Sequence, residues 1–445
     1  MALFSLFKKN AVHDFVVKKS KGDDTRVIQG AIDKASKVKG RVIFKTGTVY
    51  RSGLLSLRSN VTLFFEKGAM LKASDDLNSF KTDKDKTIDG LDHPTWSCCD
   101  YNGNPSMFFL YGKKIHDFKI AGEEEESTKI DGNEEIFYGE SNEYHIDGSF
   151  YPRVPLIFLE DSKNIEISSI TLTHSAFWTV HLVGCSNVLI KKVSIINNRK
   201  LANCDGIDPD HTKNLVVEDC RIEAADDCIA IKTTSANKAY GPCENLTFRN
   251  CTFASTSAAI KFGSETCSDI RNVHFENITI EDSNRGVAFQ LRDEGRISDV
   301  SFSDLRISTH HFSPVEWWGK GEPVIITAVR RNKDKPVGTI KNISFSNLSI
   351  TSENGLFLFG EQGKISDVSF KNIRMNLVNV TPWEKDVRDL RPSEEYPEPF
   401  HSPVSYIYLR NIEGFILENY MFLKDEAVKE KEFQPYQIYD SKIEK

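Results

Sequence analysis

The stretch Asn245-Leu-Thr-Phe-Arg-Asn-Cys-Thr-Phe253 is one copy of a phrase that recurs along this chain of 445 residues. Each copy begins with Asn or Asp, alternates apolar and polar residues, reaches a second Asn or Asp, and ends in another apolar run. The copies begin at Asn164, Asn187, Asn214, Asn245, Asn272, Asp299, Asn342 and Asp367. Their starts lie 23, 27, 31, 27, 27, 43 and 25 residues apart, so each unit is too short to be a globular domain.

The period-2 alternation predicts strands, and no copy contains an amphipathic segment of helical length. Such units must stack to bury their apolar faces, and Asn and Asp tolerate the left-handed backbone that tight corners require. The repeats therefore predict an all-β chain folded as a parallel β-helix, with coils about 4.8 Å apart along its axis. The one long gap, between Asp299 and Asn342, predicts an inserted loop that carries Trp317-Trp318 and Arg330-Arg331.

We expect a single β-helix domain over residues 1–445. Residues 1–75 would form the N-terminal cap and first coils, 76–150 loop-rich coils, 151–380 the regular coils that carry the site, and 381–445 the C-terminal loop and cap. Apolar residues at 27, 28, 31, 32 and 35 predict a short helix, capped by Asp24 or Thr25, that covers the open first coil. The polar stretches 75–104 and 382–403 are expected to be long loops over the flanks, beside a cleft.

The formal net charge of -7 argues against a nucleic-acid partner, which needs a concentrated basic surface. No stretch approaches membrane-spanning length, and residues 1–9 lack the order of a secretory leader. The sequence as given predicts a cytoplasmic protein, or a secreted or periplasmic one if a leader was removed. Most of the nine cysteines lie in strand-like runs without zinc-type spacing, and we expect reduced core thiols.

Two segments interrupt the apolar pattern with carboxylates: Asn203-Cys-Asp-Gly-Ile-Asp-Pro-Asp210 and Ala225-Asp-Asp-Cys-Ile-Ala-Ile-Lys232. Asp205 and Asp226 are 21 residues apart, about one coil, so stacking can bring them side by side. Carboxylates that lie so close together repel one another, and keeping one of them protonated relieves the repulsion. The result is one acid and one or two bases, which glycoside hydrolysis requires. Two alternatives remain open: turn-capping aspartates, or calcium bound by the same oxygens.

These segments resemble glycoside hydrolase family 28, the polygalacturonase family. Its Asn-x-Asp-Gly motif is matched by Asn203-Cys204-Asp205-Gly206, and its Asp-Asp motif by Asp226-Asp227-Cys228-Ile229-Ala230-Ile231-Lys232. The resemblance spans nearly the whole chain and implies a right-handed β-helix whose reaction inverts the anomeric centre. It also implies that Asp226 protonates the leaving oxygen while Asp205 and Asp227 activate water, with no cofactor.

Two motifs of that family are absent. Where the family has Gly-His-Gly, this chain has Ser257-Ala258-Ala259, so that Ala258 replaces the histidine. Where the family has Arg-Ile-Lys to grip the substrate carboxylate, this chain has Ala288-Phe289-Gln290. Arg is the natural bidentate partner of a uronate, and Ala offers no substitute. We therefore expect retained hydrolytic machinery without the specificity of a standard polygalacturonase.

Lys232, Lys261 and Arg292 are candidates for a relocated carboxylate-binding site, with Gln290 beside them; each cation could equally be a solvated surface charge. His211 is a candidate to replace the missing histidine, or a turn residue.

Three tryptophans are candidates for stacking on a sugar ring. Trp178 could also be packing at a coil edge, and Trp317 and Trp318 could instead anchor the inserted loop.

The expected function is hydrolysis of a glycosidic bond in a pectin-related or other oligosaccharide, with exo action if loops close one end of the cleft. The sequence leaves oligomeric state open. Two alternatives remain: a polysaccharide lyase that holds calcium in the aspartate cluster, and a non-catalytic carbohydrate-binding solenoid.

Overall fold

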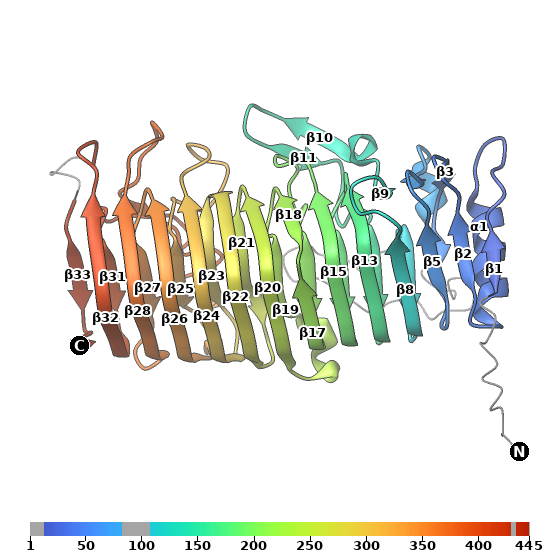
Figure 1. Cartoon of the computed structure of the whole chain (residues 1–445). Helices are drawn as coiled ribbons and strands as arrows, with labels where there is room; N and C mark the ends of the chain where they lie inside the picture. Colours follow the sequence, from blue (N-terminus) through green and yellow to red (C-terminus); the bar gives the residue numbers. More distant parts are fainter. Residues whose placement is uncertain (1–12, 82–106, 429–432, 445) are drawn as a thin grey trace, which may run out of the picture.

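The protein is an elongated right-handed parallel β-helix, described by a computed structural model over residues 13–81, 107–428 and 433–444 (Figure 1). Coils follow one another along the axis from the N-terminal helix α1 (Thr25–Ser36) at one end to strand β33 at the other. Parallel strands from successive coils pair in register, which confirms the all-β parallel β-helix predicted from the repeat.

Among the described residues, two long parallel sheets build the solenoid. The smaller, of 12 strands, carries the candidate site and comprises β4 (Leu55–Ser56), β7 (Leu110–Lys113), β12 (Ile157–Glu160), β14 (Val180–Val183), β16 (Ile207–Asp210), β19 (Ile229–Thr233), β21 (Ala258–Thr266), β23 (Arg285–Leu291), β25 (Val324–Ala328), β27 (Leu356–Gly360), β31 (Ile407–Arg410) and β33 (Tyr436–Tyr439).

The larger sheet has 18 strands and wraps the remaining sides of the coils. It comprises β1 (Asp14–Val16), β2 (Arg41–Phe44), β3 (Val49–Ser52), β5 (Thr62–Phe65), β6 (Met70–Ala73), β8 (His116–Gly122), β9 (Lys129–Asp131), β13 (Lys163–Thr173), β15 (Ser186–Ile196), β17 (Lys213–Glu218), β18 (Arg221–Ala224), β20 (Cys243–Ser255), β22 (Ile270–Ser283), β24 (Arg296–Thr309), β26 (Thr339–Ser352), β28 (Ile365–Leu377), β32 (Ile412–Lys424) and β34 (Ile443–Glu444).

Asparagine ladders hold the corners between strands. Asn187, Asn214, Asn245 and Asn272 all have positive φ, and each side-chain amide donates to the Asn one coil earlier, the bond from Asn214 to Asn187 being 3.1 Å long. The left-handed conformation explains why Asn or Asp recurs at these positions, since other non-glycine residues adopt it at a steric cost. Inside the coils, inward-facing apolar residues form one continuous core.

Helix α1 covers the first coil, as predicted. It buries Ile28, Ile32 and Ala35, and the side-chain amide of Gln29 accepts from the Ser56 N–H at 2.9 Å and donates to the Ser56 carbonyl at 3.0 Å. Gln29 thereby satisfies backbone groups at the edge of the 12-stranded sheet. The predicted cap differs: Asp24 occupies the N-cap position, but its carboxylate makes no capping bond and accepts from Ser20 and Arg51 backbone N–H groups instead.

Two antiparallel hairpins leave the solenoid on the side of the site. The first, β10 (Tyr138–Ser141) with β11 (Ile146–Gly148), projects above the coils in Figure 1. The second pairs β29 (Val387–Arg388) with β30 (Phe400–His401) and lies inside the predicted loop 382–403. The predicted insertion between Asp299 and Asn342 is not one loop, because strand β25 of the regular sheet divides it in two; the expectation missed that Val-Ile-Ile-Thr-Ala completes a coil.

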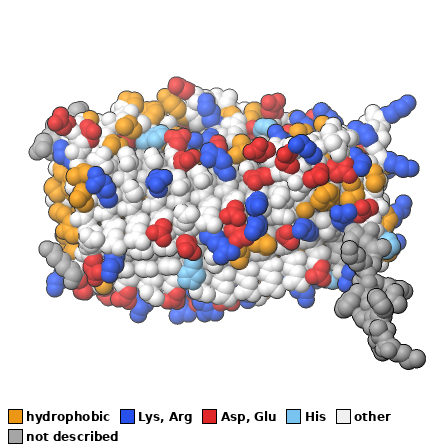
Figure 2. All heavy atoms as spheres, in the orientation of Figure 1, with side chains coloured by type: hydrophobic (Ala, Val, Ile, Leu, Met, Phe, Trp, Pro, Cys, Tyr) orange, Lys and Arg blue, Asp and Glu red, His pale blue; other side chains and the backbone are white. Residues whose placement is uncertain are grey.

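The predicted core thiols are confirmed for the seven cysteines that the structure describes, all of which are free and buried; Cys98 and Cys99 lie outside the described residues. Within the described part of the chain, no helix is both long and apolar enough to traverse a bilayer. On the face drawn in Figure 2, acidic and basic side chains are interspersed, in keeping with the small net charge.

Candidate active site

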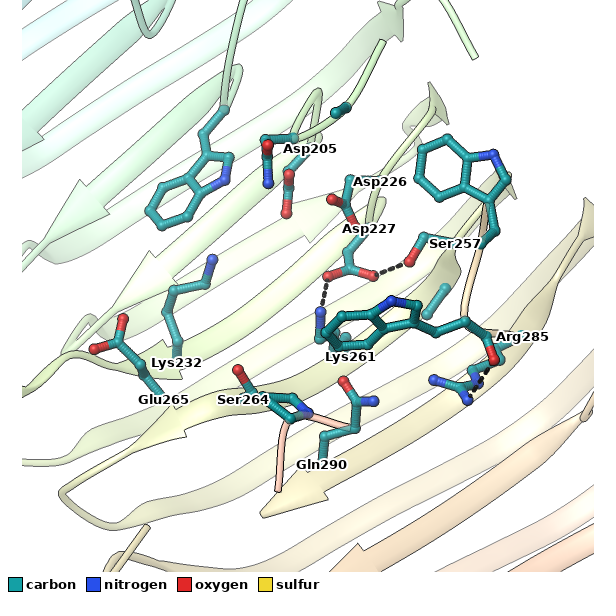
Figure 3. Close-up of a pocket in the computed structure, with 18 of the residues that line it drawn as sticks. Asp205, Asp226, Asp227, Lys232, Ser257, Lys261, Ser264, Glu265, Arg285 and Gln290 are labelled. Carbon is teal, nitrogen blue, oxygen red and sulfur yellow. Dashed lines mark hydrogen bonds and ion pairs between the residues drawn. The ribbon is translucent and has the colours of Figure 1, made fainter. Parts of the chain in front are cut away.

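The three predicted catalytic aspartates meet at one place on the 12-stranded sheet. Asp205 directly precedes Gly206 and strand β16, and Asp226 and Asp227 precede β19 on the next coil. The Gly206 N–H donates to the Asp227 carbonyl at 2.9 Å, so the two coils are fixed side by side at this point. One carboxylate oxygen from each aspartate lies within 4.8 Å of the others (Figure 3).

The aspartates line a cavity of about 430 Å³. Its remaining walls are built by neighbouring strands of the same sheet, by the β10–β11 hairpin, and by the loops that follow β24 and β29. Among its lining residues are these predicted binding residues: Trp178, Lys232, Lys261, Gln290, Trp317 and Trp318. A concave site with convergent polar groups over a rigid sheet is the usual form of a small-ligand or substrate site.

Asp227 is held by a cation and a hydroxyl. Lys261 Nζ lies 2.8 Å from Asp227 Oδ2, and Ser257 Oγ donates to Asp227 Oδ1 at 3.2 Å (Figure 3). Burial raises the pKa of Asp227, and Lys261 opposes that rise. Burial also disfavours the charge on Lys261, but Asp227, Asp226 and Asp205 outweigh it and raise the pKa of Lys261. The Lys261 ammonium therefore stays charged beside the trio.

The environment of Asp205 disfavours its anion. It is buried, and its Oδ1 has no hydrogen-bond partner among the described residues. Burial raises the pKa of Asp205 well above its usual range, and the negative charges of Asp208 and Asp226 raise it further. Asp226 is the least buried of the trio and opens to the cavity. The structure therefore gives the three carboxyls different environments, as an acid and base set requires.

A second ion pair joins strands β16 and β19. Lys232 Nζ is 2.7 Å from Asp208 Oδ1 and 3.5 Å from the centre of the Trp178 ring. Burial raises the pKa of Asp208 to about 7, and Lys232 limits that rise. Lys232 and Trp178 thus both line the cavity, and Trp178, only 4% exposed, also packs in a cluster of aromatic side chains.

The tryptophan pair Trp317-Trp318, in the loop after β24, forms another part of the cavity wall. Trp317 is buried, and its Nε1 donates to the Tyr144 carbonyl of the β10–β11 hairpin at 3.2 Å. Trp318 is 38% exposed, and the Arg391 guanidinium lies 5.2 Å from the centre of its ring. Of the two expected roles, Trp317 therefore has that of anchoring the inserted loop. Trp318 keeps an exposed face that a sugar could contact.

Two predicted binding residues do not line the cavity, and these predictions are wrong. Arg292 is fully buried and donates to the Leu291 and Leu390 carbonyls and to Thr327 Oγ1, and burial lowers its pKa to about 9. His211 is fully buried, with Nδ1 at the Gly241 carbonyl and Nε2 at 3.0 Å from the Thr234 carbonyl. Both side chains are buried away from the cavity and bond backbone carbonyls of other segments.

Several lining residues were missed by the sequence reasoning, and Arg285 is the foremost. Its guanidinium lies at the cavity beside Gln290 (Figure 3), 3.4 Å from Glu322 and bonded to the Trp318 and Asp389 carbonyls. Arg285 lies three residues before Ala288, the first of the residues that replace the family's Arg-Ile-Lys motif. A search of the whole strand β23 for cations would have found it. The others are His145, Asp147, Tyr151, Ala202, Asn203, Ser257, Ala258, Gly263, Ser264, Glu265, Glu316 and Pro392.

The three aspartates also offer oxygen ligands at a spacing that could hold a divalent cation. Lys261 places a positive charge against one of them, which opposes cation binding there.

Comparison with known proteins adds an independent finding. The family model described as glycosyl hydrolases family 28 matches residues 60–376. A probable polygalacturonase of Vitis vinifera is 30% identical over 295 residues, which cover 64% of this chain and 58% of that protein. The match thus spans less than two thirds of the grapevine protein.

An endo-polygalacturonase of Pectobacterium carotovorum subsp. carotovorum is 23% identical over 378 residues, which cover 83% of this chain and 88% of that protein. The solved structure of a family 28 exopolygalacturonase from Yersinia enterocolitica superposes with a TM-score of 0.66 at 16% identity, covering 97% of this chain and 78% of the other. At that identity the likeness shows the fold alone.

Proposed function

This chain belongs to glycosyl hydrolases family 28, whose members are O-glycosyl hydrolases, and from that premise we propose that it cleaves a pectin-related oligosaccharide by inverting acid–base catalysis. The observation that carries the proposal is the meeting of Asp205, Asp226 and Asp227, from consecutive coils, in the wall of one cavity.

Asp226 is proposed as the acid. It is the least buried of the three aspartates that line the cavity, where the glycosidic oxygen would bind, whereas Asp205 is buried. In the free protein, burial favours a proton on Asp205, so the trio must redistribute its charge when substrate binds. The Asp226 proton would pass to the leaving oxygen as the bond to the anomeric carbon breaks.

Asp205 and Asp227 are proposed to hold the attacking water. Because the two O–H bonds of a water diverge by about 105°, a water that donates to two carboxylate oxygens at about 2.7–3.0 Å each bridges oxygens roughly 4.3–4.7 Å apart. The observed spacing of at most 4.8 Å suits a single water between them. The water oxygen would bond the anomeric carbon from the face opposite the leaving group, and its proton would pass to one of the two carboxylates.

The charges at the cavity favour a neutral sugar at the cleaved bond. Each of the three cations that line it already faces a carboxylate: Lys232 faces Asp208, Lys261 faces Asp227, and Arg285 faces Glu322. Six carboxylates line the same cavity: Asp147, Asp205, Asp226, Asp227, Glu265 and Glu316. A uronate carboxylate would therefore add charge to an acidic pocket, which supports specificity different from that of a standard polygalacturonase.

A substrate screen tests this proposal. Wild type and Asp226→Asn are compared on polygalacturonate and on pectic oligosaccharides that contain neutral sugars, with reducing ends measured over time. We expect the neutral-sugar series to be cleaved faster and Asp226→Asn to lose about 10²–10⁴ in kcat. Equal cleavage of polygalacturonate would refute the charge argument.

The stereochemistry of the first product tests the roles of the carboxylates. Proton NMR at early times should show inversion at the anomeric carbon. Retention at the anomeric carbon would contradict the proposal. The test is sharp because the carboxylate oxygens lie within 4.8 Å of one another. That spacing is nearer to the about 5–5.5 Å of retaining pairs than to the about 6.5–9.5 Å of inverting pairs. An ultraviolet-absorbing product that requires a metal ion would instead identify a lyase.

A further inference from the structure

The 12-stranded sheet that forms the floor of the cavity extends beyond the cavity in both directions along the solenoid axis. On both of these flanks other side chains cover the sheet. Outward-facing residues of successive strands stand in register: Tyr111, Phe158, His181 and Asp208 on one side, and Lys261, Ala288, Ile325, Phe357 and Tyr408 on the other. The residues of this sheet that line the cavity lie on or just before β14, β16, β19, β21 and β23. What covers each flank decides how a polysaccharide can bind.

A segment that we call the strap, residues 387–401, covers the floor beyond β23. Its Leu390 belongs to one buried apolar cluster with Ile325, Phe357 and Tyr408 of the sheet. Residues in and directly after β23 fix the strap. The Gln290 amide donates to the Arg391 carbonyl at 3.5 Å, and the Arg292 guanidinium donates to the Leu390 carbonyl at 2.9 Å. This is the role of Arg292 that its sequence position did not reveal.

The strap also forms the end wall of the cavity. Pro392 lines it, and Arg391, fixed by Asp389 at 2.5 Å, lies over the Trp318 ring on the same side. Gln290, which stands where the family has its lysine, thus contacts both the cavity and the strap.

Aromatic rings fill the opposite flank. Trp178 stacks on Phe177 at 5.2 Å between ring centres and meets His181 edge-on at 4.7 Å, and His181 in turn meets Phe158 at 5.1 Å. Tyr240 packs against this cluster and donates its hydroxyl to Glu160 at 3.0 Å. Trp178 is therefore the other end wall, and Tyr111, Phe158 and His181 of the sheet behind it are buried.

The cavity is also walled along one side. The Asn142 amide of the β10–β11 hairpin donates to Glu316 at 2.6 Å, and Trp317 bonds the Tyr144 carbonyl, which ties the hairpin to the loop after β24.

These walls leave a site four strand spacings long, or about 19 Å at about 4.8 Å each. An internal bond of a long polymer would need open floor on both sides of the aspartates. We infer that the enzyme acts on a chain end or a short oligosaccharide that enters from the solvent side, and that it releases one small product at a time. This inference rests on the proposed function and specifies its substrate as a terminus.

The product pattern of the wild type tests the inference first. On the polymer that the screen identifies, a single small product should appear from the earliest times while viscosity falls slowly. A ladder of sizes with rapid loss of viscosity would overturn the inference and leave hydrolysis itself intact. Absence of cleavage on every substrate would overturn the proposed function, and this inference with it.

Binding to the inactive Asp226→Asn protein gives a readout without turnover. Calorimetry with the same oligosaccharides in increasing length should show Kd tightening by about tenfold, or about 1.4 kcal/mol, for sugars that fill the cavity. Longer oligosaccharides should change Kd by less than about twofold, since no further floor is available. Affinity that keeps rising with length would contradict a closed site.

Removal of the strap tests its part. Because Arg388 and Phe400 pair across the hairpin, residues 389–399 can be replaced by a two-residue Asn-Gly turn. If circular dichroism shows a folded β-helix, the variant should release products of several lengths. Trp318→Ala, at an exposed side chain, is the milder second variant and should broaden the products in the same direction. A folded strap variant that still yields one product would show that the strap does not set the mode of action.

Discussion

Lys261 is the residue on which the charge balance of the trio depends. Replacing it with Met removes the cation 2.8 Å from Asp227, so the pKa of that buried carboxyl should rise. A base works only when ionised, and the acidic limb of the pH profile of kcat/KM should therefore move to higher pH. We expect activity at neutral pH to fall by more than about a hundredfold.

The matched control is Lys261→Arg, which keeps the charge and should keep the acidic limb near its wild-type position. A uniform loss of activity with an unmoved limb would show that Lys261 binds substrate and does not set the ionisation of Asp227.

The division of labour between Asp226 and Asp205 is testable with an aryl glycoside of the preferred sugar. Such a leaving group departs without protonation, so Asp226→Asn should recover much of its activity, whereas Asp205→Asn should stay about 10²-fold or more below wild type. If Asp205→Asn recovered instead, its raised pKa would mark it as the acid.

For single residues, the sequence predicts where the backbone places a side chain better than it predicts which groups that side chain bonds. The aspartates follow from coil spacing alone, because residues one coil apart must meet. Arg292 and His211 lie close to the site in sequence, yet their side chains are buried in bonds to carbonyls of segments 98 and 23–30 residues away. Only tertiary structure supplies those acceptors.

Among the elements, the asparagine ladder makes a quantitative test possible. Asn214 is exposed, has a φ of 56°, donates to Asn187 and accepts from Asn245 at 3.0 Å. Asn214→Ala should lower the free energy of unfolding by about 2 kcal/mol through lost hydrogen bonds and left-handed strain. Asn214→Gly removes the strain, and should lose only about 1 kcal/mol.

Chemical denaturation of the two variants separates these contributions. Equal destabilisation by Ala and Gly would mean that backbone strain is not what selects Asn here.

Strands and corners could be predicted because both leave a periodic signal in one dimension. Strand β25 was hidden because it lies outside the Asn- or Asp-initiated phrase and is flanked by two long loops, residues 310–323 and 329–338. The two hairpins were also hidden: β10–β11 and β29–β30 are short, and side chains distant in sequence hold them, Trp317 at the Tyr144 carbonyl and Arg292 at the Leu390 carbonyl. The walls of the cavity come from these segments, so its floor was predictable and its shape was not.

At the scale of the whole molecule, the ends of the solenoid are its exposed edges. Ile32 is fully buried between α1 and the first coil, and Ile32→Ala should cost about 2–5 kcal/mol. Loosening α1 would also expose the strand edges beneath it, so we expect concentration-dependent aggregation on heating, measured by light scattering.

Val27→Ala is the matched control on the same helix, because Val27 is 39% exposed and faces solvent. If it aggregated as readily as Ile32→Ala, burial against the first coil would not be what the helix contributes.

The bond from the Gly206 N–H to the Asp227 carbonyl belongs to the ordinary ladder between coils, and it spaces the aspartates proposed to react by the repeat of the backbone itself. The walls that sort ligands are, by contrast, carried on appendages outside that ladder. Chemistry and selectivity are therefore inherited from different parts of the architecture. Loops could be exchanged to recognise new glycans while the distances between Asp226, the proposed proton donor, and the carboxylates of Asp205 and Asp227 stay unchanged.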